Sequence, residues 1–196
     1  MSVTDPVDPE EIRERASAHA ARLAAMRFPD ALRSGDRAPN FELPNAQGER
    51  VRLDSLLERG PVVLVFYRGA WCPYCNTQLR GLQEVLGDIH SLGATLVAVS
   101  PQRPDASAAF VEDAGLGFEV LSDVDSYVAS DYGVTFELSA EDRSFFLAVG
   151  NDLASVNGAD GFVPKTDVRS RDATSGAATT KPQVARWVVR KVDWSR

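Results

Sequence analysis

Two cysteines, Cys72 and Cys75, are the chain's only thiols, and two residues separate them. A cysteine pair at this spacing can close into a disulfide and reopen, and its thiolate can attack sulfur or oxygen. A zinc site built from cysteine and histidine needs about four ligands. Besides the two cysteines, the sequence offers only His19 and His90, which lie far apart in the chain. The pair therefore indicates a redox-active dithiol, with no metal and no other cofactor.

The elements around the dithiol place it where a strand gives way to a helix. Residues 62–67 form an unbroken apolar, β-branched run that predicts a buried strand. Beyond the dithiol, leucine and isoleucine recur at steps of three and four residues, which predicts an amphipathic helix ending at Gly93. Pro73 suits the first helical position, so Cys72 lies at the helix mouth and Cys75 in the first turn.

The start of that helix favours the charged form of a thiol. Unpaired backbone N–H groups and the positive end of the helix dipole face it, and cysteine pKa values there fall from about 8.5 toward roughly 3.5 to 7.5. Cys72 lies nearer to the helix mouth, and we expect it to be more exposed than Cys75. Local electrostatics alone therefore favours Cys72 as the nucleophile.

Alternating helices and strands over the rest of the chain predict an α/β sandwich. Before the dithiol, the patterns predict a helix over 10–28, a hairpin of 41–43 with 50–53, and a short helix over 54–57. After it, they predict strands over 94–99 and 118–121 and helices over 104–114, 124–131 and 140–149. The strand–helix–strand order implies a parallel crossover connection.

The composition allows one domain with a real core plus an extension, since the chain has 196 residues and 44% of them are apolar. No apolar run approaches the length that spans a membrane, and residues 1–14 are acidic and unlike a secretory signal. We therefore expect a cytoplasmic protein with no membrane partner. In a reducing compartment, a lone cysteine pair is more often catalytic or metal-binding than a structural staple.

Charge and composition change near residue 161. Residues 161–196 hold eight Lys and Arg against three Asp, whereas residues 1–160 hold thirteen basic against twenty-five acidic residues. Within this tail, 170–180 lacks apolar periodicity and predicts disorder or a long loop, and 184–194 predicts a further strand or helix. The tail has no known nucleic-acid motif, so we expect no nucleic-acid partner. The chain divides into an N-terminal helical extension, a central domain and an atypical basic, partly disordered tail, over 1–34, 35–160 and 161–196.

Short motifs at residues 35–43, 65–67, 97–100, 121–123 and 131–134 resemble those of the thioredoxin-fold peroxiredoxins, in the alkyl hydroperoxide reductase and thiol-specific antioxidant superfamily. Residues 35–43, Gly-Asp-Arg-Ala-Pro-Asn-Phe-Glu-Leu, are similar to the family's opening Gly-Asp-x-Ala-Pro-x-Phe-x-Leu. Residues 65–67 resemble the strand that enters the family's active site, and further matches lie at 97–100, 121–123 and 131–134. The resemblance covers roughly residues 35–155. It implies an α/β fold with a thioredoxin-like central mixed sheet flanked by helices, preceded here by an N-terminal helical extension.

The resemblance also implies roles for three residues. Counting from Phe66, Cys75 occupies the position of the peroxidatic cysteine, Cys72 that of a threonine and Arg68 that of a proline, a pattern that resembles a Trp-Cys-Pro-x-Cys subgroup. Cys75 would attack a peroxide and become a sulfenic acid, and Cys72 would condense with it to a disulfide. Arg68 would stabilise the thiolate or orient the peroxide. The implied substrate is hydrogen peroxide or an organic hydroperoxide, and the implied reductant is a thioredoxin-like protein or a low-molecular-weight thiol.

Two other hypotheses use the same dithiol. The site also resembles thioredoxin's Trp-Cys-x-x-Cys, in which the first cysteine is the nucleophile. Cys72 would then attack a substrate disulfide and Cys75 would release the mixed disulfide, as in a thiol-disulfide oxidoreductase. The third hypothesis is a non-enzymatic redox sensor, whose disulfide changes a partner surface.

The C-terminal part departs from the family's pattern. Pro164 is the only candidate for the proline that often faces the dithiol in the family, and a stretch bearing Lys, Asp and Arg follows it in place of an apolar strand. We therefore predict incomplete C-terminal strands and hypothesise that the reading frame or gene end changed near residue 161. Missing strands would leave an open sheet edge and exposed apolar surface, with low stability or lost activity.

Overall fold

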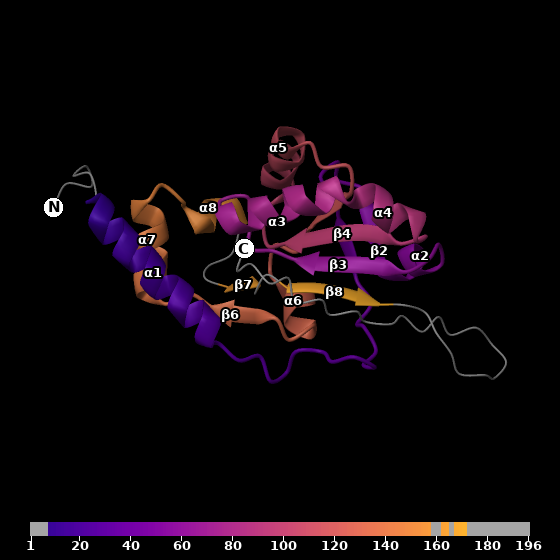
Figure 1. The fold of residues 1–196 in the computed structure, drawn as a ribbon, viewed down its shortest axis with the longest axis horizontal. Coiled ribbons are helices and arrows are strands. Elements are labelled where there is room, and N and C mark those ends of the chain that lie inside the picture. The colour runs from indigo at the N-terminus through magenta and orange to yellow at the C-terminus, as the bar shows by residue number, and fades with distance from the viewer. Residues whose placement is uncertain (1–7, 158–161, 165–166, 172–196) are drawn as a thin grey trace.

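A four-stranded mixed sheet forms the centre of the computed structural model, which describes residues 8–157, 162–164 and 167–171 (Figure 1). Its strand order is β5-β4-β3-β8. The first three strands are parallel, and β8 runs antiparallel to β3. The strands are β3 (Val62–Phe66), β4 (Thr95–Ser100), β5 (Glu119–Ser122) and β8 (Asp167–Arg171).

The side chains of β3 alternate between two apolar cores, one on each face of the sheet. Leu64 and Phe66 belong to one core, and Val65 with Tyr67 belongs to the other. A strand that is buried on both faces reads as a continuous apolar run rather than an alternating one. The run over 62–67 has this character, which confirms the predicted buried strand.

Helices cover both faces of the sheet. The helices α3 and α5 supply Leu79 and Phe110 to the core that contains Val65. On the opposite face, Leu56 of α2 and Val128 of α6 pack against the core that contains Phe66. The bounds are α2 (Leu53–Leu57), α3 (Pro73–Glu84), α4 (Leu86–Ser91), α5 (Pro104–Ala114) and α6 (Tyr127–Asp131).

The predicted hairpin is present as β1 (Glu42–Pro44) paired antiparallel with β2 (Arg50–Arg52). The layered α/β prediction is confirmed.

The helix after the dithiol is shorter than predicted. The apolar pattern predicts that it runs on to Gly93, but it ends at Glu84. The next residue, Val85, has backbone angles of φ −101° and ψ 11° that leave the helical region. The separate helix α4 carries Leu86 and Ile89 onto the same core. The pattern of apolar residues continues across the break because both helices pack on one sheet face, so the periodicity could not reveal it.

A smaller cluster lies at one end of the molecule, where Figure 1 shows α1 beside α7. Leu138, Phe145, Phe146 and Leu153 are its buried members, and Ile12 of α1 packs against them. The elements here are α1 (Pro9–Ala25), β6 (Thr135–Glu137), α7 (Ala140–Ala148), α8 (Leu153–Asn157) and β7 (Phe162–Pro164). The sequence patterns predicted α1 and α7 but missed β6, α8 and β7. Helix α1 ends at Ala25, three residues before the predicted end at residue 28.

The prediction for the C-terminal stretch is wrong in part. The Asp- and Arg-bearing residues 167–171 form β8, which pairs with β3 in the register Val65 to Val168. Residues 170 and 171, assigned to a loop by composition, belong to this strand. A mixed, partly charged sequence can form a strand when a preformed neighbour offers its free backbone groups. Residues 172–180 and 184–194, where a loop and a final element were predicted, lie outside the described residues.

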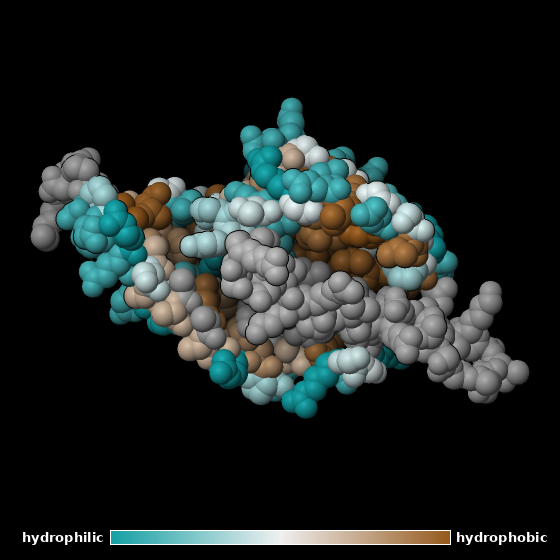
Figure 2. Space-filling view, viewed as in Figure 1, coloured by the Kyte–Doolittle hydropathy of each residue, from teal (hydrophilic) through white to brown (hydrophobic). Residues whose placement is uncertain are grey.

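Hydrophilic side chains cover α5 and the N-terminal end of α1, whereas apolar surface gathers over the β3 and β4 region beside α4 (Figure 2). Tyr74, Leu92 and Tyr127 are the most exposed large apolar side chains of the described part, at 77%, 79% and 71%. Among the described residues, no helix combines the length and the apolar character needed to cross a membrane.

Candidate active site

A tight loop between β3 and α3 leads to the two cysteines, with Cys72 at the N-cap of α3 and Cys75 in its first turn. Gly69 has a backbone φ of 139°, and a Cβ atom there would lie 2.5 Å from Nε1 of Trp71, so only glycine fits. The loop is fixed by Ala70, whose N–H donates to Gln102 Oε1 at 2.6 Å and whose carbonyl accepts from Asn76 Nδ2 at 2.8 Å. The chain therefore enters α3 in one defined conformation.

Cys72 is the N-cap of α3 and Pro73 is its first residue, as the sequence predicts. The backbone N–H of Cys75 donates to Cys72 Sγ at 3.4 Å, a weak contact of the kind that sulfur makes at a helix start. No disulfide joins Cys72 to Cys75 in the structure, and each is 1% exposed. The expectation that Cys72 would be the more exposed sulfur is therefore wrong, because the surrounding side chains cover both equally.

Arg68 lies directly beside the dithiol. Its Nη2 donates to Cys72 Sγ at 2.9 Å, and its guanidinium lies over the ring of Trp71, 5.5 Å from the ring centroid. Only 8% of Arg68 is exposed. An arginine is not deprotonated in proteins, so a positive charge lies permanently against the sulfur.

The other terminal nitrogen of the guanidinium, Nη1, contacts residues that were not predicted to belong to the site. Arg68 Nη1 lies 3.1 Å from Nε2 of His19, and Nδ1 of His19 lies 2.9 Å from Oδ1 of Asp142. Arg22 also donates to the Asp142 carboxylate. Four buried side chains thus run unbroken from α7 through α1 to Cys72.

The ionisation of this chain follows from burial and from neighbouring charges. The hydrogen bond with Cys75 and then burial raise the pKa of Cys72, against the lowering by Arg68 and the Cys75 N–H. The charge of Cys75 also raises the pKa of Cys72, so the two thiols release their protons in separate steps. As the pH rises, the pair therefore carries one negative charge before it carries two. The lowered pKa that is expected at the start of a helix does not extend to both cysteines.

The pKa values of the remote pair shift in the same direction for different reasons. Burial lowers the pKa of His19, against the raising effect of Asp142. Burial raises the pKa of Asp142, but the hydrogen bonds from His19 and Arg22 outweigh it and lower the pKa overall. At neutral pH, a neutral imidazole therefore lies between a carboxylate and a guanidinium.

Aromatic side chains close the site. The ring of Trp71 meets that of Phe146 at a centroid distance of 4.8 Å, and Phe146 also packs edge-on against His19 at 5.2 Å. Nε1 of Trp71 is buried without a hydrogen-bond partner among the described residues. Trp71 and Phe146 therefore lie together beside His19 and the Arg68 guanidinium.

The three predicted site residues, Cys72, Cys75 and Arg68, come together in the fold. The sequence offers His19 only as a possible metal ligand and gives no role to Asp142. One signal was available, since a histidine and an arginine at positions i and i+3 of the predicted first helix share a helix face. Their partner on α7 carried no sequence signal. No group of three or more metal-ligating side chains gathers within the described part of the chain.

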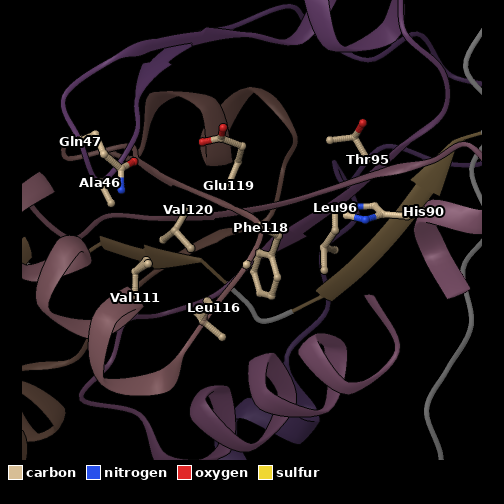
Figure 3. Close-up of a pocket in the computed structure, with 11 residues that line it drawn as sticks. Ala46, Gln47, His90, Thr95, Leu96, Val111, Leu116, Phe118, Glu119 and Val120 are labelled. Atoms are coloured by element: carbon tan, nitrogen blue, oxygen red, sulfur yellow. The ribbon is translucent and has the colours of Figure 1, made fainter. Parts of the chain in front are cut away.

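A hollow of about 270 Å³ lies away from the dithiol, at the starts of β4 and β5 (Figure 3). Its floor is apolar and includes Leu96, Phe118 and Val120, and His90 and Glu119 lie at its edges. None of the predicted site residues lines it. His90 therefore has no part in the dithiol site.

A thioredoxin-like sheet that presents a buried dithiol at the start of a helix defines a thiol-redox class of protein. Within that class, the sequence matches the AhpC/TSA family over residues 34–152, and the chain belongs to this family. The Trp-Cys-Pro-x-Cys subgroup is a finer assignment that this match does not address.

Named relatives agree with the family. The chain is 38% identical over 102 residues to a "Putative peroxiredoxin" of Mycobacterium tuberculosis, which covers 52% of the chain and 64% of that relative. It is 35% identical over 115 residues to Peroxiredoxin Bcp of Escherichia coli, covering 58% and 72%. The match therefore spans less than two thirds of the Mycobacterium relative.

Solved structures share the fold. The crystal structure of Peroxidoxin BcpB from Mycobacterium tuberculosis superposes with a TM-score of 0.55 and 26% identity, over 72% of this chain and 78% of that one. The Xanthomonas campestris Bacterioferritin Comigratory Protein gives a TM-score of 0.55 at 16% identity, over 76% and 77%. This second likeness supports the fold alone.

Proposed function

We propose that the chain is a thiol-dependent peroxidase that cycles Cys72 and Cys75 between a dithiol and a disulfide. The observation that carries the proposal is the buried, hydrogen-bonded thiol pair beside the Arg68 guanidinium, in a chain of the AhpC/TSA family. The names of the relatives support a hydroperoxide as the substrate. A thioredoxin-like protein or a low-molecular-weight thiol is the proposed reductant, in a cytoplasmic setting.

Cys75 is the proposed nucleophile. Its thiolate attacks one peroxide oxygen, so that an S–O bond forms, the O–O bond breaks, and the other oxygen leaves with a proton as water or an alcohol. Cys72 then displaces the hydroxyl of the Cys75 sulfenic acid, which leaves as water, and an S–S bond forms. Two electrons from the thiol reductant restore both thiols.

Two arguments support this division of roles. The hydrogen bond with Cys75 and burial raise the pKa of Cys72, which supports Cys72 as the resolving thiol and not as the nucleophile. Counting from Phe66 along the active-site pattern that the sequence resembles also supports Cys75 as the peroxidatic cysteine. Arg68 then holds the sulfur of Cys72 in place and supplies positive charge to the pair.

Burial of both sulfurs requires the site to open. The peroxide must reach residues that are 1% exposed. The side chain that closes the site, Trp71, packs against Phe146 and has no hydrogen bond from Nε1 among the described residues, so it can move more easily than a hydrogen-bonded side chain. We therefore assign the entry path to the Trp71 side.

We also propose the division of the chain into 1–34, 35–160 and 161–196. The family match over 34–152 supports its central part.

The test compares Cys72→Ser and Cys75→Ser after a stoichiometric pulse of hydrogen peroxide, with sulfenic acid trapped and quantified. Sulfenic acid is expected in Cys72→Ser, where the proposed nucleophile remains, and not in Cys75→Ser. The opposite result would overturn the assignment of roles. Reduction of insulin disulfides with little consumption of peroxide would overturn the peroxidase itself in favour of a disulfide reductase.

A further inference from the structure

We propose that His19 and Asp142 are positioning residues for Arg68, so that helices α1 and α7 set the charge state of the Cys72/Cys75 dithiol. The inference deepens the proposed function and rests on it for its biological meaning. Its physical basis is the unbroken series of contacts from Asp142 through His19 and Arg68 to Cys72 Sγ, at 2.9, 3.1 and 2.9 Å.

The hydrogen-bonding capacities of the partners fix the tautomer of His19. A guanidinium can only donate, so Nε2 of His19 must accept from Arg68 and carries no proton. The Asp142 carboxylate can only accept, so Nδ1 of His19 carries the proton and donates it. A protonated ring would place an N–H against the guanidinium N–H, and the contact with Arg68 would be lost.

The position of Arg68 depends on that acceptor. The guanidinium has two described contacts besides the dithiol, the His19 nitrogen and the face of Trp71. The Trp71 ring attracts the charge but does not fix the rotation of the guanidinium plane, whereas the hydrogen bond to His19 does. With Nη1 tied to His19, Nη2 is directed at Cys72 Sγ.

Burial, with the two neighbouring arginines, keeps the ring of His19 neutral at physiological pH. Asp142 faces it from α7, Arg68 from the loop after β3, and Arg22 from the next turn of α1. Burial is the largest influence and lowers the pKa of His19, and both arginines act in the same direction against Asp142. Acidification that protonates His19 therefore releases Arg68 from its position beside the dithiol.

Two of these groups lie outside the segment that defines the family. The family match begins at residue 34, so His19 and Arg22 belong to a part of the chain that precedes it. They nevertheless reach the dithiol, because α1 packs against α7 and places His19 against Phe146. If His19 had a purely structural role, it would hold α1 against α7 without any effect on the ionisation of the thiols. A positioning role predicts that replacing His19 changes the fraction of thiolate.

The first test uses the unmodified full-length chain. Long-range ¹H–¹⁵N NMR of the imidazoles reports the tautomer of each histidine, and His90→Gln assigns the His19 signals. The neutral Nδ1–H tautomer is expected for His19 in the reduced protein at pH 7, with a pKa below the usual 6.5. An Nε2–H tautomer would overturn the proposal.

The second test follows the thiolate itself by its absorbance at 240 nm between pH 4 and 10, in the full chain. His19→Phe keeps an aromatic ring beside Phe146 but removes the acceptor, and we expect roughly tenfold less thiolate at pH 7, equivalent to about one pH unit in the midpoint. His19→Gln offers an amide oxygen to Arg68 and an amide N–H to Asp142, so it is expected to restore most of the thiolate.

Arg15→Ala is the matched control, since Arg15 joins α1 to Phe145 and Glu141 of α7 without touching Arg68. Its thiolate midpoint is expected to match that of the unmodified chain. Equal midpoints for His19→Phe and the unmodified chain overturn the proposal, as does a midpoint shift in Arg15→Ala as large as in His19→Phe. Neither test uses a peroxide, so their outcome is independent of whether the protein is a peroxidase.

Discussion

Two parts of the molecule build the dithiol site in opposite ways. In the strand–loop–helix segment over 67–76, the partners are close in sequence, as with Arg68 and Cys72, which lie four residues apart. In the pair of helices α1 and α7, the partners are remote, and 123 residues separate His19 from Asp142. The near segment supplies the reactive sulfurs, and the remote pair supplies the environment of the arginine that contacts them. A motif can thus specify the chemistry of a site without specifying its charge balance.

The largest effect is expected where the two parts meet, at Arg68. Arg68→Met removes a charge-assisted hydrogen bond, a contact worth about 1.5–3 kcal/mol, so the rate constant for reaction with hydrogen peroxide at pH 7 should fall by roughly ten- to a hundredfold. Stopped-flow measurement of a single turnover checks this. Arg80→Met removes the same charge from an exposed ion pair between α3 and Asp113 of α5 and should leave the rate unchanged. Similar rates for both variants would show that Arg68 has no special role.

Gly69→Ala tests the near segment alone. The new methyl group would enter the space of Trp71 Nε1 at a backbone angle that favours glycine, so the free energy of unfolding should fall by about 1–3 kcal/mol. Urea denaturation measures this change. Gly81→Ala, in the interior of α3 with open space around it, should instead stabilise the protein by about 0.5–1 kcal/mol. A neutral Gly69→Ala would contradict the tight fit of the loop.

The remote pair predicts a pH dependence of stability. Burial lowers the pKa of His19, so the unfolded chain binds a proton near pH 6.5 that the folded chain does not bind until a lower pH. The stability is therefore fully present above about pH 6.5 and falls on acidification, by at most about 1.4 kcal/mol per pH unit for one proton. Urea titrations at pH 7, 6 and 5 should show a shallower fall in His19→Gln. Parallel curves would falsify the neutral, buried state of His19.

The smallest effect is expected at the rim of the remote pair. Arg15→Ala removes a partly exposed contact with Phe145, so the free energy of unfolding should fall by less than about 1 kcal/mol. Thermal unfolding followed by circular dichroism is sufficient to measure it. A larger loss would mean that α1 is held mainly by this contact and not by the buried chain through His19.

The sequence predicted the elements near the dithiol well because their signals are local. The apolar run that became β3, Pro73 at the first position of α3, and Gly115 after α5 all act within a few residues. The failures share a different cause. The break at Val85 lies within a continuous apolar pattern, and β8 is a strand through its pairing with β3 rather than through its own composition.

The sequence by itself determined which atoms can react: two thiols at the start of a helix, with an arginine four residues before the first. It also indicated the family, because the motifs that carry the resemblance are short and contiguous. Only the tertiary structure decided how those atoms are surrounded. The equal burial of Cys72 and Cys75 arises in the core that Val65, Leu79 and Phe110 share with them. The approach of His19 and Asp142 to Arg68 arises from the packing of α1 against α7. Contacts between residues so distant in the chain leave no periodic signal, since they depend on where whole elements come to lie and not on local spacing.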